Sequence, residues 1–412
     1  MDLDVLPVGN RRYNRLPACA TAPVSGRFRL TAETALPTHW LPRMDRRVCI
    51  QLPSVGIYPE LGRMLGSAFS DLGWRPTVRH RADAAALDQD LLVLVGLCRY
   101  IEGLPEVLGQ RQGRKPTTVL WQLEPLPPVQ LSPAGEAIGF RVAACDWGRL
   151  PRRVRRVLNG VVPFRTKLMR LARRWVARAY TRQVIHEPDH AGWGGYDVEN
   201  YFNAMADWRW IRAAHASGWL DHCFATVQPR VRFLRSRGIA AEMLPVGYHP
   251  DWGRDRGLPR DIDVLFLGDI RRGRRADLVR WLGRQLAARG RTLTVVRKAH
   301  GADRESLLGR ARIAVNLLRA PHDLAGVRLL MGMGCGALIV SEPCADTGAF
   351  EPGRHFVMAE VARLPEVIDE YLVDDEKRQA IAREGQRLVT EELTLTRVVS
   401  RMLQQVTACV WR

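Results

Sequence analysis

The strongest constraint on the fold of this chain is a repeated pattern of strand, loop and helix across residues 261–360. The first strand is predicted at residues 262–267, and four more short, apolar and partly β-branched segments follow at residues 293–296, 313–317, 337–341 and 355–358. Helix-length segments separate these strands. Because strands that alternate with helices are typical of parallel sheets with right-handed crossovers, we predict an α/β domain whose ligand site lies at the carboxyl ends of the strands.

A second α/β pattern precedes the first one along the chain. Strands are predicted at residues 48–52, 91–95, 117–122 and 221–226, with helices at 60–72 and 230–237. Residues 253–259 are rich in Gly, Pro and charge, which indicates a linker between two domains. We therefore predict an arm at residues 1–45, an N-terminal domain at 46–253, a C-terminal domain at 254–394 and a final helix within 395–412.

Composition places the chain among globular proteins rather than disordered or membrane-spanning ones. Its 412 residues suffice for two or three cores, and 46% of them are apolar. The N-terminus lacks a basic region followed by an apolar core, and the longest apolar run, residues 91–98, is too short to span a bilayer. The eight cysteines form no C-x-x-C pair, so no structural zinc site is indicated. We predict a cytoplasmic protein with reduced cysteines.

The net charge of +19 is concentrated in one segment. Residues 149–183 contain twelve Arg and Lys residues and no Asp or Glu. Leu168, Leu171, Trp175 and Ala179 would share one face of a helix there. Such a helix either lies on an anionic membrane, as a peripheral contact at its inner face, or packs its apolar stripe on the N-terminal domain. Nucleic-acid binding is the weaker alternative, because the segment contains no recognised reading module.

Residues 311–318 and 328–342 carry a family pattern, the second stretch reading R-L-L-M-G-M-G-C-G-A-L-I-V-S-E. The pattern resembles the donor half of two-domain (GT-B) glycosyltransferases, in particular the CgeB-like, "glycosyl transferases group 1" kind, which runs roughly R-x-F-E-A-x-A-x-G-A-x-x-x-S-D/E. Residues 244–250 also look like that family's segment between domains, and the resemblance extends over about residues 244–393.

The resemblance implies an α/β fold of two Rossmann-like domains facing a cleft, with the final helix crossing back to the N-terminal domain. It also implies a hexosyltransferase-like enzyme that takes a nucleotide sugar as donor substrate and needs neither a catalytic metal nor another cofactor. One departure stands out: the family usually has Glu where this chain has Met331, and that acid commonly contacts the ribose hydroxyls of the donor. Its replacement predicts weaker donor binding, or donor binding of a different kind.

The spacing of a dinucleotide-binding fingerprint is present in this sequence, but without the strand and helix that the fingerprint needs. Gly332, Gly334 and Ala337 satisfy its spacing, but the fingerprint requires a strand before it and a helix after it. The predicted order in this chain is reversed. Close packing of a helix is therefore the better interpretation of these glycines.

Positive side chains follow the predicted strands of the C-terminal domain. They would stabilise the negative charge that develops on the leaving diphosphate, unless they simply form a basic surface. Polar residues at strand ends, together with Asp323, would bind the sugar or the ribose, unless they act as helix caps or turn formers. The predicted donor-binding residues are Gly268, Arg271, Arg272, Arg297, Lys298, Asn316, Asp323, Arg328, Gly336 and Glu342.

Activation of an acceptor hydroxyl requires a general base if the reaction inverts the anomeric centre. Glu124 follows a predicted strand of the N-terminal domain, where its carboxylate would face the cleft. His190 lies in a polar loop that also contains His186, Glu187 and Asp189. We predict Glu124 and His190 as catalytic residues. A lone Glu before Pro is usually structural, however, and the spacing of the polar loop fits no standard zinc motif.

The sequence as a whole therefore predicts a glycosyltransferase that moves a sugar from a nucleotide donor to an unidentified acceptor. Two alternatives stay open. Met331 would also suit a catalytically silent protein that keeps the fold as a binding or scaffolding module. Residues 149–183 would suit a peripheral protein of anionic membranes.

Overall fold

A computed structural model describes residues 46–144 and 198–410, except residues 114, 128, 130, 269, 271–273, 319–323, 325 and 345. Several of the predictions lie outside the described residues. These are the arm at residues 1–45, the basic segment 149–183, and the site residues His190, Arg271, Arg272 and Asp323.

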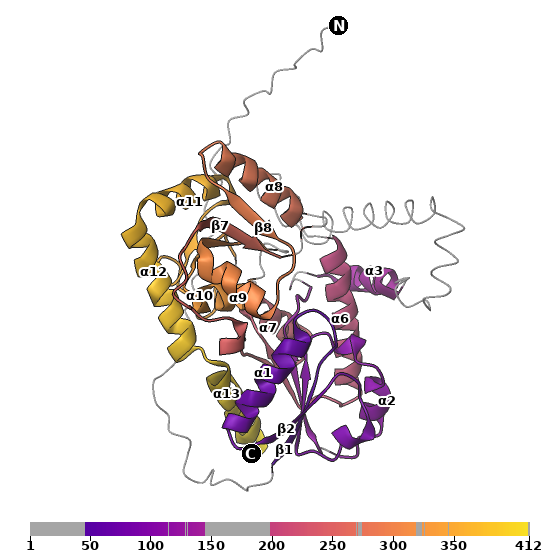
Figure 1. The fold of residues 1–412 in the computed structure, drawn as a ribbon. Helices are drawn as coiled ribbons and strands as arrows, with labels where there is room; N and C mark the ends of the chain where they lie inside the picture. Colours follow the sequence, from indigo (N-terminus) through magenta and orange to yellow (C-terminus); the bar gives the residue numbers. More distant parts are fainter. Residues whose placement is uncertain are drawn as a thin grey trace, which may run out of the picture.

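The first domain is built on a six-stranded sheet in the order β2-β1-β3-β4-β5-β6, and every pair of neighbouring strands is parallel. Figure 1 shows its elements β1, β2, α1 and α2 in purple. Its strands are β1 (Arg47–Gln51), β2 (Arg75–Arg79), β3 (Leu91–Val95), β4 (Thr117–Gln122), β5 (His222–Ala225) and β6 (Ala241–Met243). Its helices are α1 (Tyr58–Asp71), α2 (Leu104–Gly109), α3 (Pro133–Ala144), α6 (Val198–Ala216) and α7 (Gln228–Ser236), with short 3₁₀ turns at Ala84–Ala86 and Cys98–Tyr100.

Alternating side chains of this sheet enter two separate cores. Leu91 and Val93 pack with α1 on one face, whereas Leu92 and Leu94 pack with residues of α6 and α7, such as Trp208, on the other. Burial on both faces explains why the central strands are continuous apolar runs rather than alternating ones.

The second domain contains a parallel five-stranded sheet in the order β11-β10-β9-β7-β8. Its strands are β7 (Ile262–Leu267), β8 (Leu293–Val296), β9 (Ala311–Asn316), β10 (Leu338–Ser341) and β11 (Val357–Met358). Its helices are α8 (Arg274–Ala287), α9 (Gly301–Arg310), α10 (Gly326–Gly334), α11 (Leu364–Val373) and α12 (Asp375–Arg387), with 3₁₀ turns at Pro250–Trp252 and Val361–Arg363 and a π-helical turn at Leu388–Glu392. The chain therefore folds into two Rossmann-like domains, which confirms the predicted fold class.

All five strands predicted for the second sheet are present, each within two residues of its predicted boundary. Two strands of the first sheet, β2 and β6, are not predicted from the sequence. β2 is an edge strand that contains Pro76 and begins and ends with arginines, and β6 has only three residues. Neither strand is buried on both faces. Both therefore lack the run of apolar residues from which a strand is predicted in a sequence.

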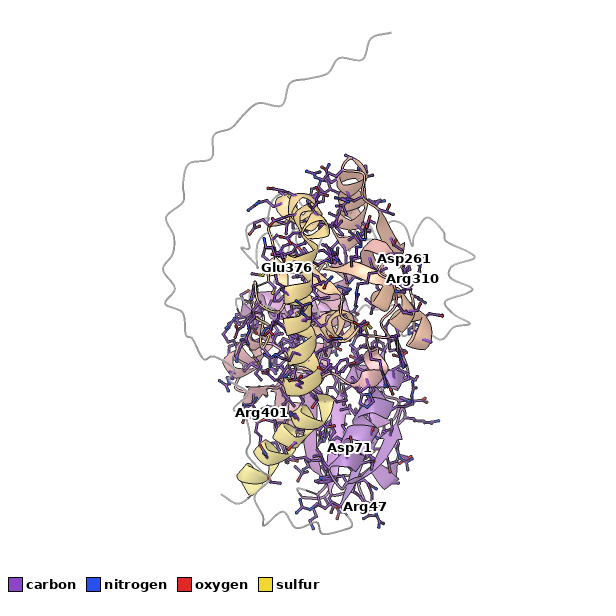
Figure 2. All side chains as sticks on the ribbon, turned by 60° about the vertical axis from the view of Figure 1, so that its left-hand side comes forward. Arg47, Asp71, Asp261, Arg310, Glu376 and Arg401 are labelled. Atoms are coloured by element: carbon purple, nitrogen blue, oxygen red, sulfur yellow. The ribbon has the colours of Figure 1, made fainter. Side chains whose placement is uncertain are left out.

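The last helix, α13 (Leu395–Val410), packs against α1 of the first domain. Thr396 Oγ1 lies 3.3 Å from Asp71 Oδ2, and Gln405 donates a hydrogen bond to Glu242. Figure 2 shows α12, which carries Glu376, on the second domain, and α13, which carries Arg401, alongside the first. The chain thus passes from the first domain to the second and back again.

Within the described ranges, none of the helices combines the length and the apolar character that crossing a membrane requires.

Candidate functional site

A cavity of about 550 Å³ lies between the two domains. Glu124 follows β4 of the first sheet, Gly268 follows β7 of the second, and Arg297 and Lys298 follow β8; all four line the cavity. The carboxyl ends of the two parallel sheets therefore open onto one cleft, which is where ligands bind in this class of fold.

Arg328, in the first turn of α10, is fixed at the second-domain wall of the cleft. Its Nη1 donates to Asn316 Oδ1 at 2.7 Å and to the carbonyl of Leu317 at 3.2 Å, and its Nε donates to the carbonyl of Leu267 at 3.2 Å. The guanidinium carbon also lies 5.3 Å from the centre of the Phe266 ring. Since α10 begins at Gly326, the positive end of the helix dipole adds to the charge of Arg328.

Gly268 allows this arrangement because it has no side chain. A Cβ atom at this position would lie 3.1 Å from Arg328 Nη2. The loop after β7 can therefore approach the guanidinium closely.

Arg297 and Lys298 add two positive charges to the same wall. Both side chains are exposed, and neither has an ion-pair partner within the part of the chain that the structure describes. Such cations at the end of a strand can meet the oxygens of a phosphate group without first breaking a bond inside the protein.

Three of the residues predicted for the donor site do not line the cavity: Asn316, Gly336 and Glu342. Asn316 is fully buried and donates from Nδ2 to Ser341 Oγ at 3.0 Å while its Oδ1 accepts from Arg328. Glu342 is buried and accepts a hydrogen bond from the Leu318 amide. The structure thus places Asn316 behind Arg328, where it positions the guanidinium.

Gly336 lies where α10 leads into β10, near the segment that joins the two domains. Its φ is +72°, and a Cβ would lie 2.5 Å from Asp255 Oδ2 and 2.6 Å from Arg260 Nη2. The left-handed backbone and the close packing therefore account for a glycine at this position, without any contact with a ligand.

Met331 is buried and lines the cavity, three residues after Arg328 on α10. Residues three apart on a helix share a face. The structure therefore puts an apolar thioether at the cleft wall, beside the fixed guanidinium.

Glu124 lies on the opposite, first-domain wall. Its Oε1 accepts a hydrogen bond of 2.8 Å from the hydroxyl of Tyr58, and its carbonyl accepts one from Gln122 Nε2. Burial, with the neighbouring Glu124 as a second cause, raises the pKa of Tyr58 well above its usual value. Tyr58 therefore stays neutral and acts as the donor that orients the carboxylate of Glu124.

A second polar group of this wall was not predicted from the sequence. Arg99, just after β3, donates from Nε to Asp207 Oδ1 at 2.6 Å and from Nη2 to Asn203 Oδ1 at 3.0 Å. Asp207 is only 2% exposed, and burial, which outweighs the attraction of Arg99, raises its pKa to about 7. Its position between the buried Met205 and Trp208 of α6 is the one sequence signal that could have found it, because a carboxylate rarely lies on the buried face of a helix.

Arg304 of α9 joins the two domains at the cleft. Its side chain is 2% exposed, and its Nη1 donates to Glu60 Oε2 of α1 at 2.7 Å. Its Nε and Nη2 donate to the carbonyls of Trp252 and Asp251 at 3.2 and 2.9 Å. An ion pair between a buried guanidinium and a partly exposed carboxylate therefore connects the first domain to the second.

Over the described stretches of chain, no group of three or more His, Cys, Asp or Glu side chains is arranged to hold a metal ion.

In comparison with known proteins, residues 260–404 match the family model described as glycosyl transferase-like. No curated protein sequence matches the chain. Among solved structures, sucrose-phosphate synthase from Thermosynechococcus elongatus superposes with a TM-score of 0.50 at 11% identity, over 88% of this chain and 100% of that one. HepE of Anabaena, solved with UDP and glucose, has a TM-score of 0.45 at 13% identity, over 88% and 100% of the two chains.

The likeness to sucrose-phosphate synthase extends over both domains, but at 11% identity it concerns the fold alone. The family match concerns the second domain, which holds Gly268, Arg297, Lys298 and Arg328. The second domain therefore matches the glycosyl transferase-like family model, in a chain that has the two-domain GT-B fold.

Proposed function

We propose that this protein is a glycosyltransferase that binds a nucleotide sugar on the second-domain wall of the cleft and an acceptor on the first-domain wall. The observation that supports this most strongly is Arg328. It is a cation held by three hydrogen bonds at the N-terminus of α10, inside the region that matches the family and at the edge of the cavity.

The proposed reaction breaks the bond between C1 of the sugar and the terminal phosphate oxygen of the donor. The electron pair of that bond stays with the nucleoside diphosphate, so negative charge grows on the leaving oxygen. Arg297, Lys298 and Arg328 would stabilise that charge, with Arg328 preorganised and the other two closing on the phosphates. Arg271 and Arg272, outside the described residues, complete the proposed cationic group. Asp323, also outside them, is proposed to orient the sugar.

The acceptor oxygen forms the new bond to C1 and gives up its proton. Glu124 is the proposed base of the described wall, because Tyr58 orients its carboxylate at the cleft. His190 remains a second proposed base outside the described residues. In this proposal the positive side chains do the electrostatic work that a divalent cation does in metal-dependent transferases, and the enzyme uses neither a metal nor another cofactor.

A thermal-shift panel of UDP, GDP and TDP, each free and as its glucose conjugate, tests donor binding. A compound at a hundred times its dissociation constant adds about 2.7 kcal/mol to the free energy of unfolding, which a melting curve resolves readily. We expect at least one compound to stabilise the protein. Absence of stabilisation by every compound at millimolar concentration would count against the transferase.

The double variant Arg297→Ala/Lys298→Ala then tests whether the cleft is the binding site. Both side chains are exposed, so the variant should fold normally and lose most of the shift caused by the nucleotide. Arg289→Ala removes an exposed arginine of the same domain outside the cavity lining, and it should leave the shift intact. Equal shifts in both variants would place the nucleotide elsewhere.

Peripheral contact with anionic membranes through residues 149–183, and with it a cytoplasmic location at the inner membrane face, remains a separate prediction from charge. Flotation with liposomes of neutral or anionic lipid measures it. Charge reversal of Arg173, Arg174 and Arg178 should abolish binding to anionic liposomes, and unchanged flotation would exclude this role.

A further inference from the structure

The first-domain wall of the cleft contains a buried carboxylate of which only one oxygen accepts a hydrogen bond. Asp207 Oδ1 accepts from Arg99, whereas Oδ2 has no hydrogen-bond partner among the residues that the structure describes. The side chain lines the cavity although it is 2% exposed. A buried polar atom without a partner costs about 1–3 kcal/mol, so its presence at a ligand cleft points to a partner that the ligand supplies.

Two exposed apolar side chains of the first domain line the same cavity as this carboxylate. Tyr100 is 51% exposed and Val55 is 47% exposed, and Val55 lies beside Tyr58 at the same cavity. The guanidinium of Arg99 lies 4.2 Å from the centre of the Tyr100 ring. Arg99 can cover only one face of that ring, so the exposed area of Tyr100 is available to a ligand.

The charge of this wall is balanced before any ligand arrives, because two cations, Arg99 and the buried Arg230, lie with two carboxylates, Asp207 and Glu124. Arg99 already donates to Asp207 and to Asn203, and Glu124 adds a second carboxylate close enough to raise the pKa of Asp207. Arg297 and Lys298, which have no ion-pair partner among the described residues, lie on the other domain. An anionic acceptor would therefore meet no surplus of positive charge on this wall, whereas a neutral molecule with hydroxyl groups would find hydrogen-bond partners for them.

A sugar ring has both properties that this wall requires, namely an apolar face of C–H groups and an edge of hydroxyl groups. We propose that Val55, Arg99, Tyr100, Asn203 and Asp207 form a subsite for an uncharged saccharide acceptor, in which Tyr100 packs against the C–H face of the ring and Asp207 Oδ2 binds a hydroxyl. This assignment rests on the proposed transferase function, because it defines the acceptor of the same cleft.

Saturation-transfer NMR with methyl glucoside, methyl galactoside and methyl mannoside tests the subsite, with the protein held in excess UDP or whichever nucleotide stabilises it. Glycerol 1-phosphate serves as the anionic comparison. We expect at least one glycoside to bind, with the strongest saturation on its ring C–H protons, and we expect glycerol 1-phosphate to bind weakly or not at all.

Two variants locate the binding. Asp207→Asn keeps the shape and the contact with Arg99, and it should weaken glycoside binding about tenfold. Tyr100→Ala removes an exposed side chain, so it should fold normally and weaken glycoside binding by a similar factor. Asp369→Asn, in an ion pair with Arg291 outside the cavity lining, and Val373→Ala, an exposed apolar side chain of α11, are the matched controls and should bind like the wild type.

The outcomes separate this subsite from the transferase proposal. If a nucleotide binds but no glycoside does, or if only glycerol 1-phosphate binds, the saccharide subsite is wrong and the donor site stands. If Asp207→Asn lowers the melting temperature and leaves glycoside affinity unchanged, Asp207 is structural and the assignment fails. If glycosides bind through Tyr100 and no nucleotide does, the subsite stands and the transferase proposal fails.

Discussion

At the scale of single residues, Met331 is the position at which the proposed donor site can be tested most sharply. The family that the sequence resembles usually has Glu there, which implies a contact with the ribose hydroxyls of a donor, whereas this chain has a buried thioether one helical turn from Arg328. Met331→Glu would add a charged hydrogen-bond acceptor, and Arg328 on the same helix face would offset part of its burial cost.

We expect Met331→Glu to lower the dissociation constant of the stabilising nucleotide several-fold, measured by isothermal titration. Met331→Gln has the same shape without the charge, and it should improve binding less. If Met331→Glu folds with an unchanged melting temperature and binds no better than the wild type, the donor is held without contact at this position.

Asp207 also predicts a pH dependence of stability. Its pKa is about 7 in the folded protein against 3.8 for an ordinary aspartate, so between these values the folded state holds a proton that the unfolded state has released. A raised carboxyl pKa gives stability that is fully present below the unfolded value and is lost as pH rises through the folded value. The melting temperature of the wild type should therefore fall relative to that of Asp207→Asn between pH 4 and about pH 7.

Melting curves of both proteins across that pH range measure the difference directly. The contributions of other groups, including the partly buried His222 and the buried His355 with their lowered pKa values, are common to both proteins and cancel. A constant difference across the range would mean that the pKa of Asp207 is not raised.

At the scale of elements, the features that can be predicted from the sequence are those that depend on a local pattern of residues. The central strands are apolar on both faces and are bounded by Gly and charged residues, so their positions and the chemistry at their ends follow from the sequence. In the structure Glu124, Gly268, Arg297 and Lys298 each follow a strand and line the cavity, and the roles predicted for them stay predictions.

Burial behind the site is not a local property. Asn316 also ends a strand, yet its amide turns inward to Ser341 and Arg328, because the neighbouring strand and helix supply partners that are distant in sequence. Asp207 lies in a helix that is not predicted from the sequence, and it reaches the cleft only through the packing of α6 against the loop after β3. Pairings of this kind depend on the tertiary fold.

The contact between residues 247–248 and the start of α13 is a second element-scale feature. Tyr248 exchanges two backbone hydrogen bonds of 2.7 Å with Leu393 and Leu395, and a Cβ at Gly247 would lie 2.5 Å from the Leu395 Cα. Gly247→Ala must therefore displace backbone, and we expect a loss of about 1–3 kcal/mol in the free energy of unfolding.

Denaturant unfolding measures this loss. Gly109→Ala is the control, because a Cβ there meets nothing within 4 Å and the backbone conformation is not left-handed. If Gly247→Ala proves as stable as Gly109→Ala, α13 is not held closely at this point.

At the scale of the whole molecule, one hydrophobic cluster runs from the first domain through Tyr248 and Trp252 into the second. Arg304 lies beside it and binds Glu60 across the cleft. Glu60→Gln would leave a buried guanidinium without its counter-charge, which typically costs 3–5 kcal/mol. We expect a large fall in melting temperature, whereas Glu366→Gln, in an exposed ion pair with Arg363, should change it little.

Small-angle scattering of Glu60→Gln then shows whether the domains separate or the fold merely weakens. A larger radius of gyration in the folded variant would show that the ion pair holds the cleft closed. An unchanged radius of gyration together with an unchanged melting temperature would show that the ion pair of Arg304 does not hold the domains together.

The transfer of a sugar across the cleft is tested most directly by the release of nucleoside diphosphate from nucleotide sugars, with and without a methyl glycoside. We predict release from at least one donor that rises when the glycoside is added and falls in Arg297→Ala/Lys298→Ala and in Asp207→Asn. Release that is absent for every UDP, GDP and TDP sugar, from a protein that binds both the nucleotide and the glycoside, would contradict the transferase function.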